Sequence, residues 1–573
     1  MTAMLQRAAV SRRDAFLILL GAVCMQLWSF AFHPSSQNAI VITESPTPSL
    51  SLKLPSVDPL SGTPHALTSL PHTSIVAHAP GWTVFQNLYM SNGTLLLLSP
   101  SKEVFPGIRL MTSTGLAAQN SPENIREREP TKENMDFVTP EQAQQRWGST
   151  DGKSYRIWSI KGNTILHNDP PQFLHHYFHF VAELFFGTWA FWLGAFTQPS
   201  PSPSFALSLS LHLNASYPPP IHRVIFTHSD PEGWHDTPGF DGYFLRAAFP
   251  SLTVESQMGW NDLISATRPS SNSNSTSKAD QRAWHFPYAL LSDRSAAHRG
   301  VVCGSRTQRT ASEAWQFMLT QNRLVGVHAG RWWDPVREAV WKFAGVQSGD
   351  AVRWMKTIHE ERVDQNGKDV ERGGKQLVEV TPDLVRQGAF QSLLPHPSRI
   401  TISYISRQPS RGRKLAPEAH AGLVKALQAL VARRNQARTE DGQPEWELNI
   451  VAAEELNRDE QIQIAARTTI MLGIHGNGLT HLVFMPPTRV STVIEIFYPK
   501  GFAHDYQWTS TALGMKHIGV WNDTYFTLPA KEPRVNYPPG FHDDKIPVHG
   551  PSVAKLIEDR VDGKLAISES DTA

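Results

Sequence analysis

Short β-branched runs alternate with amphipathic stretches between residues 400 and 497. Residues 400–406 (ITISYIS) and 448–452 have the length and composition of buried strands, and residues 417–434 carry leucines at helical spacing. The pattern continues with a predicted helix over 458–466, a strand over 468–474, a short helix over 479–484 and a strand over 492–497. Strands that alternate with helices form parallel βαβ units. This region therefore predicts an open α/β sheet.

The rest of the chain predicts a second α/β half. Residues 222–227 (HRVIFT) read as a buried strand, and the Pro- or Ser-rich stretches 199–220 and 268–278 read as surface loops. At roughly 100–200 residues per domain, 573 residues allow about two to four domains. A polar stretch at 360–375 separates the halves. We predict an N-terminal domain over 76–375, a C-terminal domain over 376–530 and a C-terminal extension over 531–573.

The N-terminus predicts a membrane anchor. Residues 15–32 are apolar apart from Gln26 and Ser29, and they follow a cytoplasmic tail, 1–14, that carries three arginines. Eighteen helical residues cover roughly 27 Å, about one hydrocarbon core. A cleaved signal peptide is the alternative, because Ser29 and Ala31 are small residues at a possible cleavage site. Either segment would deliver the body of the protein to a secretory lumen.

The stretch that follows predicts a stem. Residues 33–75 are rich in Pro and Ser and lack the periodicity of a packed element. Sequons for N-glycosylation fit a lumenal body, and they occur at Asn92, Asn214, Asn274 and Asn522. We expect a single-pass type II protein of the Golgi or endoplasmic reticulum membrane.

Charge and cysteine content exclude several classes of protein. The 53 Lys and Arg balance 52 Asp and Glu, whereas nucleic-acid binders usually carry a basic excess. Two cysteines, Cys24 and Cys303, are too few for a disulfide-rich module or a Cys-rich zinc module. No nucleic-acid partner is expected.

The strongest local motif is the glycine turn after the strand 468–474. His475-Gly476-Asn477-Gly478 precedes a short helix, and glycines there allow a tight turn and the close approach of a ligand. Helix N-termini bind anions, so the turn suits a diphosphate, with the backbone amides around Gly476 to Leu479 facing it. Its alternative role is a strand-to-helix connection without a ligand.

A group of cations follows the strand 400–406. Arg407 lies at the carboxyl edge expected to face ligands in an open α/β sheet, and Arg413 and Lys414 follow in a loop. Three cations could neutralise a diphosphate leaving group. No Asp-x-Asp motif for a metal-bound diphosphate is present in the chain. A solvated basic loop is the alternative.

The segment 175–189 (HHYFHFVAELFFGTW) supplies candidates for proton transfer. On a helix, His175, His179 and Glu183 would share one face. His179 could accept a proton from a substrate hydroxyl while Glu183 orients its ring. Two alternatives stay open: the three side chains bind a metal ion in a hydrolase, or the helix is simply packed by its aromatic residues.

Weaker candidates lie elsewhere. Glu495 stands in the apolar strand VIEIF and could hold ribose hydroxyls. His504 and Asp505 could line a cleft or lie in a surface loop. Asp293 and Arg294 could contact an acceptor, and His176 is a further candidate for the acceptor side or the cleft.

Together these segments resemble glycosyltransferase family 61, and in particular its fungal membrane-anchored members. The family includes extracellular O-linked N-acetylglucosamine transferases and plant xylan xylosyl- and arabinosyltransferases. The resemblance lies in patches over about residues 150–525. The matching residues are His179-Phe180 with Glu183, the block Tyr404-Ile405-Ser406-Arg407 with Arg413 and Lys414, and His475-Gly476-Asn477-Gly478-Leu479-Thr480 with Glu495. Where family members commonly carry Asn and Asp around the motif histidine, this chain has His176 and Glu183, and Asn477 replaces a frequent Ala.

The resemblance implies a GT-B fold of two facing Rossmann-like domains. The C-terminal domain would bind a UDP-sugar and the N-terminal domain a glycan or glycoprotein acceptor, with inversion at the anomeric carbon. GlcNAc or xylose is the expected sugar, and no cofactor is required beyond the donor, with metal dependence left open. A non-catalytic sugar-binding relative is a further alternative.

Overall fold

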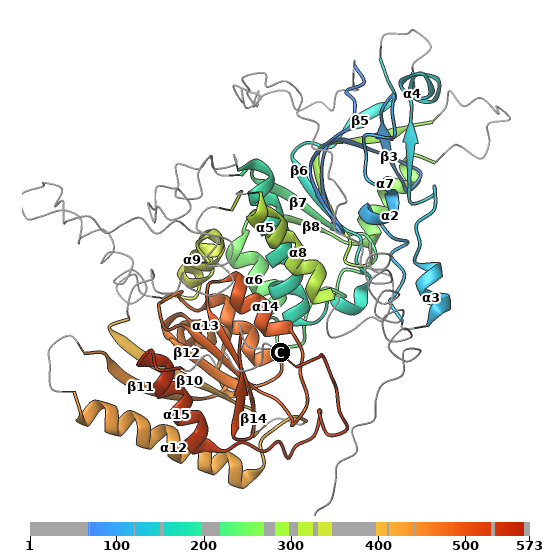
Figure 1. The fold of residues 1–573 in the computed structure, drawn as a ribbon. Coiled ribbons are helices and arrows are strands. Elements are labelled where there is room, and N and C mark those ends of the chain that lie inside the picture. The colour runs from blue at the N-terminus through green and yellow to red at the C-terminus, as the bar shows by residue number, and fades with distance from the viewer. Residues whose placement is uncertain are drawn as a thin grey trace, which may run out of the picture. The chain divides into compact units, whose positions relative to one another are not determined.

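The computed structural model describes residues 67, 69–119, 121–148, 154–197, 218–268, 281–296, 307–321, 323–324, 330–346, 397–409, 412–438, 443–528 and 533–565. The chain forms two compact units. In the first, Met1–Thr63 with Ser101–Pro106, the described residues form a short loop in which Ser101 Oγ donates to Glu103 Oε2 (2.6 Å). The second unit, Pro64–Pro100 with Gly107–Ala573, holds all the helices and strands given below (Figure 1).

The first sheet of this second unit has nine strands and is mixed. Its order is β4-β3-β2-β9-β6-β7-β8, with β1 paired to β2 and β5 to β9. The strands are β1 (Ser74–Ala79), β2 (Trp82–Ser91), β3 (Thr94–Leu98), β4 (Met135–Val138), β5 (Ile157–Ser159), β6 (Asn163–His167), β7 (Ile221–Phe226), β8 (Thr253–Glu255) and β9 (Ala283–Ser292).

This first sheet differs from the parallel, Rossmann-like sheet that the sequence predicts. Strands β6, β7, β8 and β9 are parallel, but β1, β2, β3 and β9 pair antiparallel around β2. Gly81 and Gly93 adopt φ of 83° and 85° in the turns after β1 and β2. Positive φ is what tight hairpin turns require, so these strands fold back on their neighbours instead of crossing over.

Helices of the first half include the segment predicted to carry His179. It is a π-helix, η2 (Phe178–Phe185), that continues as α5 (Phe186–Phe196). The others are α2 (Ile108–Met111), α3 (Pro122–Glu127), α4 (Pro140–Trp147), η1 (Pro171–Phe173), α6 (Phe240–Ala248), α7 (Gln257–Ala266), α8 (Thr307–Thr320), η6 (Arg331–Trp333) and α9 (Asp334–Phe343).

The second sheet confirms the predicted α/β pattern of residues 400–497. Its order is β11-β10-β12-β13-β14-β15, parallel from β11 to β14 with β15 antiparallel at the edge. The strands are β10 (Arg399–Ser406), β11 (Glu445–Ala452), β12 (Ile470–Ile474), β13 (Thr492–Ile496), β14 (Lys516–Trp521) and β15 (Thr524–Phe526).

Helices of the second half begin where the sequence supplies start signals. Pro417 opens α12, and Asn457 and Glu460 form a capping box at α13. The segment predicted as a short helix at 479–484 is a 3₁₀-helix that starts earlier, at Asn477. The helices are α12 (Pro417–Gln436), η8 (Ala453–Glu455), α13 (Arg458–Arg467), η9 (Asn477–Phe484), α14 (Asp505–Ala512) and α15 (Gly550–Val561).

Two predicted boundaries differ from the structure. β1 begins at Ser74, so the last two residues of the predicted stem 33–75 belong to the first sheet. In the predicted extension 531–573, α15 packs on α12, with Leu556 and Ile557 in one core with Leu427 and Leu430. Apolar residues at helical spacing bury one face of α15. The described part of the extension therefore belongs to the second half.

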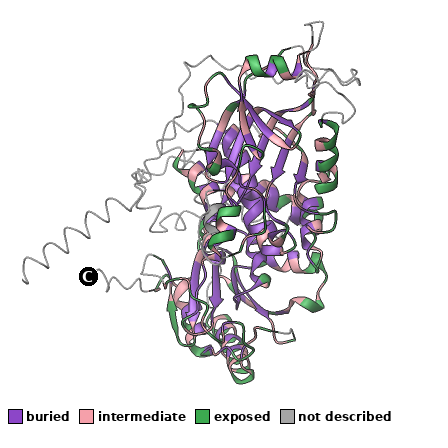
Figure 2. Ribbon diagram, turned by 90° about the vertical axis from the view of Figure 1, so that its right-hand side faces the viewer, coloured by how far each residue is buried: buried purple, intermediate pink, exposed green. Residues whose placement is uncertain are grey.

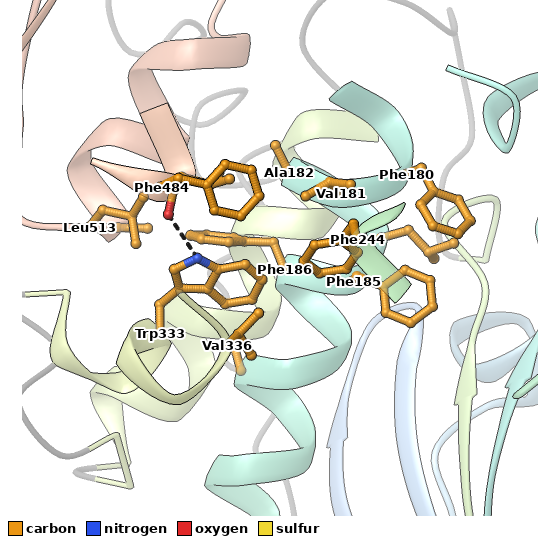
Figure 3. Close-up of a cluster of buried hydrophobic side chains, with 14 of the residues drawn as sticks. Phe180, Val181, Ala182, Phe185, Phe186, Phe244, Trp333, Val336, Phe484 and Leu513 are labelled. Atoms are coloured by element: carbon orange, nitrogen blue, oxygen red, sulfur yellow. Dashed lines mark hydrogen bonds between the residues drawn. The ribbon is translucent and has the colours of Figure 1, made fainter. Parts of the chain in front are cut away.

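The two halves share one hydrophobic core. Phe186 of α5 and Trp333 of η6 lie 5.0 Å apart between ring centroids, and they pack with Phe484 and Leu513 of the second half (Figure 3). The central strands β2, β9, β10, β12 and β13 are buried along most of their length, whereas the edge strands β8, β11 and β15 are not (Figure 2). The Trp333 indole N–H donates to the Val483 carbonyl oxygen across this junction (3.0 Å). The halves therefore hold their relative position by packing as well as by hydrogen bonds.

No helix within the described ranges is long and apolar enough to cross a membrane. The predicted anchor at 15–32 lies outside those ranges.

Candidate functional site

The glycine turn and two of the predicted cations come together at the carboxyl edge of the second sheet. β10 runs parallel to β12, with Ile405 beside Gly473, so the residues after both strands emerge at the same edge. Gly476 has φ 150°, and a Cβ placed on it would lie 2.2 Å from Arg407 Nη1 and 3.7 Å from Arg413 Nη2. The positive φ and the close approach of the Arg407 guanidinium explain why glycine stands here. The arrangement concentrates positive charge on the turn.

Other residues predicted around the turn contribute less. The Lys414 ammonium lies 4.0 Å from Asp544 Oδ2, so a carboxylate partly balances its charge. Leu479 and Thr480 have buried side chains, and the Leu479 N–H donates to the Gly476 carbonyl oxygen (3.0 Å). Asn477 is exposed. The expectation that the Leu479 amide faces a ligand is therefore wrong, because the 3₁₀ turn uses that amide internally.

The Glu495 carboxylate contacts the His475 ring and orients it. His475 Nδ1 lies 2.5 Å from Glu495 Oε1, and His517 Nε2 lies 2.7 Å from Glu495 Oε2. Burial, with Arg413 nearby, lowers the pKa of His475, and burial, with Asp505 nearby, raises the pKa of Glu495. Burial also lowers the pKa of His517 to about 3. The cluster is therefore built around neutral imidazole rings.

Glu495 does not reach a ligand. It is 0% exposed, and each of its two oxygens faces one histidine. The predicted contact with ribose hydroxyls is therefore wrong, since His475 and His517 occupy both carboxylate oxygens. Sequence reasoning missed His517. It lies one strand over in β14, on the face that Glu495 occupies, so strand alternation was the available signal.

The side chains of Asp505 and His504 have different neighbours in the structure. Asp505 opens α14 with its Oδ2 3.9 Å from His475 Nε2, so it belongs to the cluster around the turn. The His504 ring stacks on Trp508 with centroids 4.6 Å apart, and its Nδ1 lies 2.6 Å from Gln507 Oε1. Only Asp505 of the two faces the glycine turn.

The predicted pair His179 and Glu183 is formed, without His175. His179 Nδ1 lies 2.7 Å from Glu183 Oε2. His175 precedes the helix, is exposed, and has its Nδ1 3.2 Å from the Pro171 carbonyl oxygen. The predicted three-residue face is wrong because the helix starts only after His175. Within the described part of the chain, no group of three or more His, Cys, Asp or Glu residues is arranged to hold a metal ion.

His176 lies beside this pair. Its ring centroid is 4.7 Å from that of His179, and burial, together with His179, lowers its pKa to about 4. Arg413 of the second half lowers this pKa further, by a smaller effect. His176 is therefore a neutral neighbour of His179.

Asp293 and Arg294 are buried and do not face an acceptor. Asp293 accepts hydrogen bonds from the Ser113 amide (2.6 Å) and from Asn168 Nδ2 (2.7 Å). Burial, with Asp169 nearby, raises the pKa of Asp293 to about 6. Arg294 pairs with Asp169 and Glu183, at 2.8 Å and 2.9 Å. The predicted acceptor contacts are wrong, because both side chains are occupied inside the first half.

The π-helix η2 brings the two groups of residues together. Tyr177 Oη lies 3.1 Å from His481 Nδ1, and the rings of Phe178 and Tyr506 have centroids 4.8 Å apart. One small pocket is lined by Glu183 from the first half and by Asp505 from the second. The predicted proton acceptor, His179, therefore lies on a helix that packs against η9, the helix that follows the glycine turn.

Two of the four sequons lie within the described residues. Asn92 and Asn522 are exposed, and both adopt φ of 50° in turns between antiparallel strands. Asn214 and Asn274 lie outside the described residues. Both described sequons are sterically accessible to modification.

Comparison with known proteins assigns a family. The family model described as Glycosyltransferase 61 matches residues 177–494, a span that begins just before η2 and ends within β13. A search of curated proteins found no match. The matched span includes the His179–Glu183 pair, Arg407, Arg413 and the glycine turn. Because it covers more than half of the 573 residues, the chain belongs to glycosyltransferase family 61 and carries a glycosyltransferase domain.

Proposed function

We propose that the protein is an inverting glycosyltransferase that moves a sugar, GlcNAc or xylose, from a UDP-sugar to a hydroxyl of a glycan or glycoprotein. We propose further that its two halves correspond to a GT-B arrangement in which the first sheet is mixed instead of fully parallel. One observation carries the proposal: η2, which holds the His179–Glu183 pair, packs against η9, which begins at the Gly476 turn beside the Arg407 guanidinium.

The reaction is a single displacement. The unprotonated Nε2 of His179 takes the proton of the acceptor hydroxyl, while Glu183 holds the ring through Nδ1. The acceptor oxygen forms its bond to the anomeric carbon as the bond from that carbon to the diphosphate oxygen breaks, and the electron pair leaves with UDP. Arg407 and Arg413 stabilise the negative charge that grows on the diphosphate. The positive charge of both groups is present before the donor binds.

The glycosyltransferase family and the geometry favour this reaction over the metal-dependent hydrolase. The hydrolase needs His175 as a third ligand, and His175 is exposed and bonded to its own preceding turn. A non-catalytic sugar-binding protein shares the nucleotide site and differs in turnover, so measurement of transfer separates the two.

The first experiment is a thermal-shift screen of the full-length protein in detergent. UDP, UDP-GlcNAc, UDP-xylose and other nucleotide sugars are tested with Mn²⁺ and with EDTA. We expect UDP-dependent stabilisation that is lost in Arg407→Ala and kept in His179→Ala, whereas sugar transfer is lost in both. Absence of any UDP-dependent stabilisation of the wild type would refute the proposal.

A second experiment tests the secretory location. We propose a type II orientation in the Golgi or endoplasmic reticulum membrane, with the catalytic body in the lumen. Glycosidase treatment should then shift the mobility of the protein from its native host, and Asn92→Gln with Asn522→Gln should each remove part of the shift. A protein that carries no glycan and is digested by protease added outside sealed microsomes would contradict the lumenal location.

A further inference from the structure

Asp169 and Arg294 leave the first sheet side by side. β6 and β9 are adjacent parallel strands with His167 opposite Ser292, and the Asn168 amide donates to the Ser292 carbonyl oxygen (2.9 Å). Asp169, two residues after His167, and Arg294, two residues after Ser292, therefore lie together at the carboxyl edge of the sheet. Asp169 Oδ1 accepts the backbone N–H of Arg294 (2.7 Å), and its Oδ2 accepts from Nε (2.8 Å). Asp169 thus fixes both the backbone and the guanidinium of Arg294.

The guanidinium then reaches the π-helix. Arg294 Nη1 donates to the His179 carbonyl oxygen and to Glu183 Oε2, both at 2.9 Å. One nitrogen therefore holds the backbone of the histidine and the carboxylate that orients its ring. The side chains of Arg294, Asp169 and Glu183 are 1%, 0% and 2% exposed, so water does not screen these contacts.

The charges in this network are also matched to proton transfer. Asp169 and Glu183 bring two carboxylates to one guanidinium, that of Arg294, and the buried Asp293 carboxyl lies near Asp169. When His179 accepts a proton, its imidazolium supplies the missing positive charge next to Glu183. The network is therefore closer to electrical balance after His179 has taken up the proton than before.

We propose that the Asp169–Arg294 pair is the positioning element of the site, which holds His179 and Glu183 in the geometry for deprotonation of the acceptor. This inference rests on the proposed function of His179. Neither Asp169 nor Arg294 touches substrate, so neither is a catalytic residue.

Arg294→Lys and Asp169→Asn in the full-length protein test the inference. Lysine keeps the charge but presents one nitrogen, which cannot serve Asp169, the His179 carbonyl and Glu183 with the fork of Arg294. Asparagine keeps the shape and removes the charge. We expect kcat to fall by roughly 10- to 100-fold in each variant. The KM for the UDP-sugar and the UDP-dependent thermal shift should stay within about twofold of the wild type.

A matched control is Arg337→Lys. Arg337 is another arginine buried in the first half and paired with an aspartate, Asp334, and its Nε donates to the Val483 carbonyl oxygen near the C-terminal end of η9 (3.4 Å). We expect it to lower Tm without lowering kcat.

The outcomes separate the two proposals. A wild type without transfer activity contradicts the proposed function. An active wild type whose kcat is unchanged in Arg294→Lys, or whose kcat falls as much in Arg337→Lys, overturns the positioning role. A variant that loses its UDP-dependent thermal shift together with kcat also overturns it, because the effect then extends to the nucleotide site.

Discussion

Gly476→Ala is the substitution with the best-defined effect on the nucleotide site. Its backbone has φ 150° and ψ 175°, a conformation that is essentially restricted to glycine and costs other residues about 1–3 kcal/mol. The new Cβ would also lie 2.2 Å from Arg407 Nη1. Ordinary van der Waals contact begins near 3.4 Å, so the guanidinium must move by about 1 Å.

This movement predicts a loss of nucleotide affinity. A hydrogen bond to a charged group contributes about 1.5–3 kcal/mol, and each 1.4 kcal/mol is tenfold in Kd. If Arg407 loses one such bond to the diphosphate, Kd for UDP rises by roughly 10- to 100-fold. Isothermal titration calorimetry of the full-length protein measures Kd, and thermal unfolding measures the backbone strain separately.

Gly563→Ala is the matched control. Gly563 has φ 69°, and nothing lies within 4 Å of a Cβ placed on it, so alanine there meets an unfavourable backbone without crowding a neighbour. We expect a fall in Tm with unchanged UDP affinity. If Gly476→Ala bound UDP as tightly as the wild type, the placement of the diphosphate beside Arg407 would be refuted.

Three further predictions concern stability. Trp333→Phe removes the indole donor of the Val483 carbonyl and leaves only the longer bond from Arg337 Nε (3.4 Å). It should cost about 0.5–1.5 kcal/mol, seen in calorimetry as one shifted transition because the halves share a core. Burial raises the pKa of Asp241 to about 10, so its carboxyl is neutral in the folded state and ionised in the unfolded state above about pH 4. Stability then falls as pH rises through that window, and Asp241→Asn should raise Tm more at pH 8 than at pH 5. Burial lowers the pKa of His167 and His517 to about 3, so stability should fall as pH drops from about 6.5 towards 3. In the Asp241→Asn background, a Tm that stayed constant between pH 6.5 and 4 would contradict this reasoning.

The elements of the second half were predictable because their signals are local. The residues of β10, α12, α13 and β12 each contain the full period-2, apolar-run or helical pattern that defines the element. The first half was less predictable. β2 pairs with β9 almost 200 residues later, and no local pattern records that partner or its antiparallel direction.

The residues of the candidate site could likewise be predicted only in part from local sequence. Composition and spacing alone were sufficient to single out His179, Glu183, Arg407 and the glycine turn as chemically capable groups. They also grouped His175 with His179, because no local signal shows that the helix begins only at Phe178, three residues after His175.

The sequence by itself determined the family, the α/β pattern of the second half and the residue types available for chemistry, because each is encoded in contiguous residues. Only the tertiary structure decided which side chains meet. Glu495 turns to two histidines instead of a ligand, and Arg294 turns to Asp169 and the His179–Glu183 pair instead of an acceptor. The physical reason is that burial forces a charged group to find a partner, and strand register, which joins residues more than 100 positions apart, decides which partner is within reach.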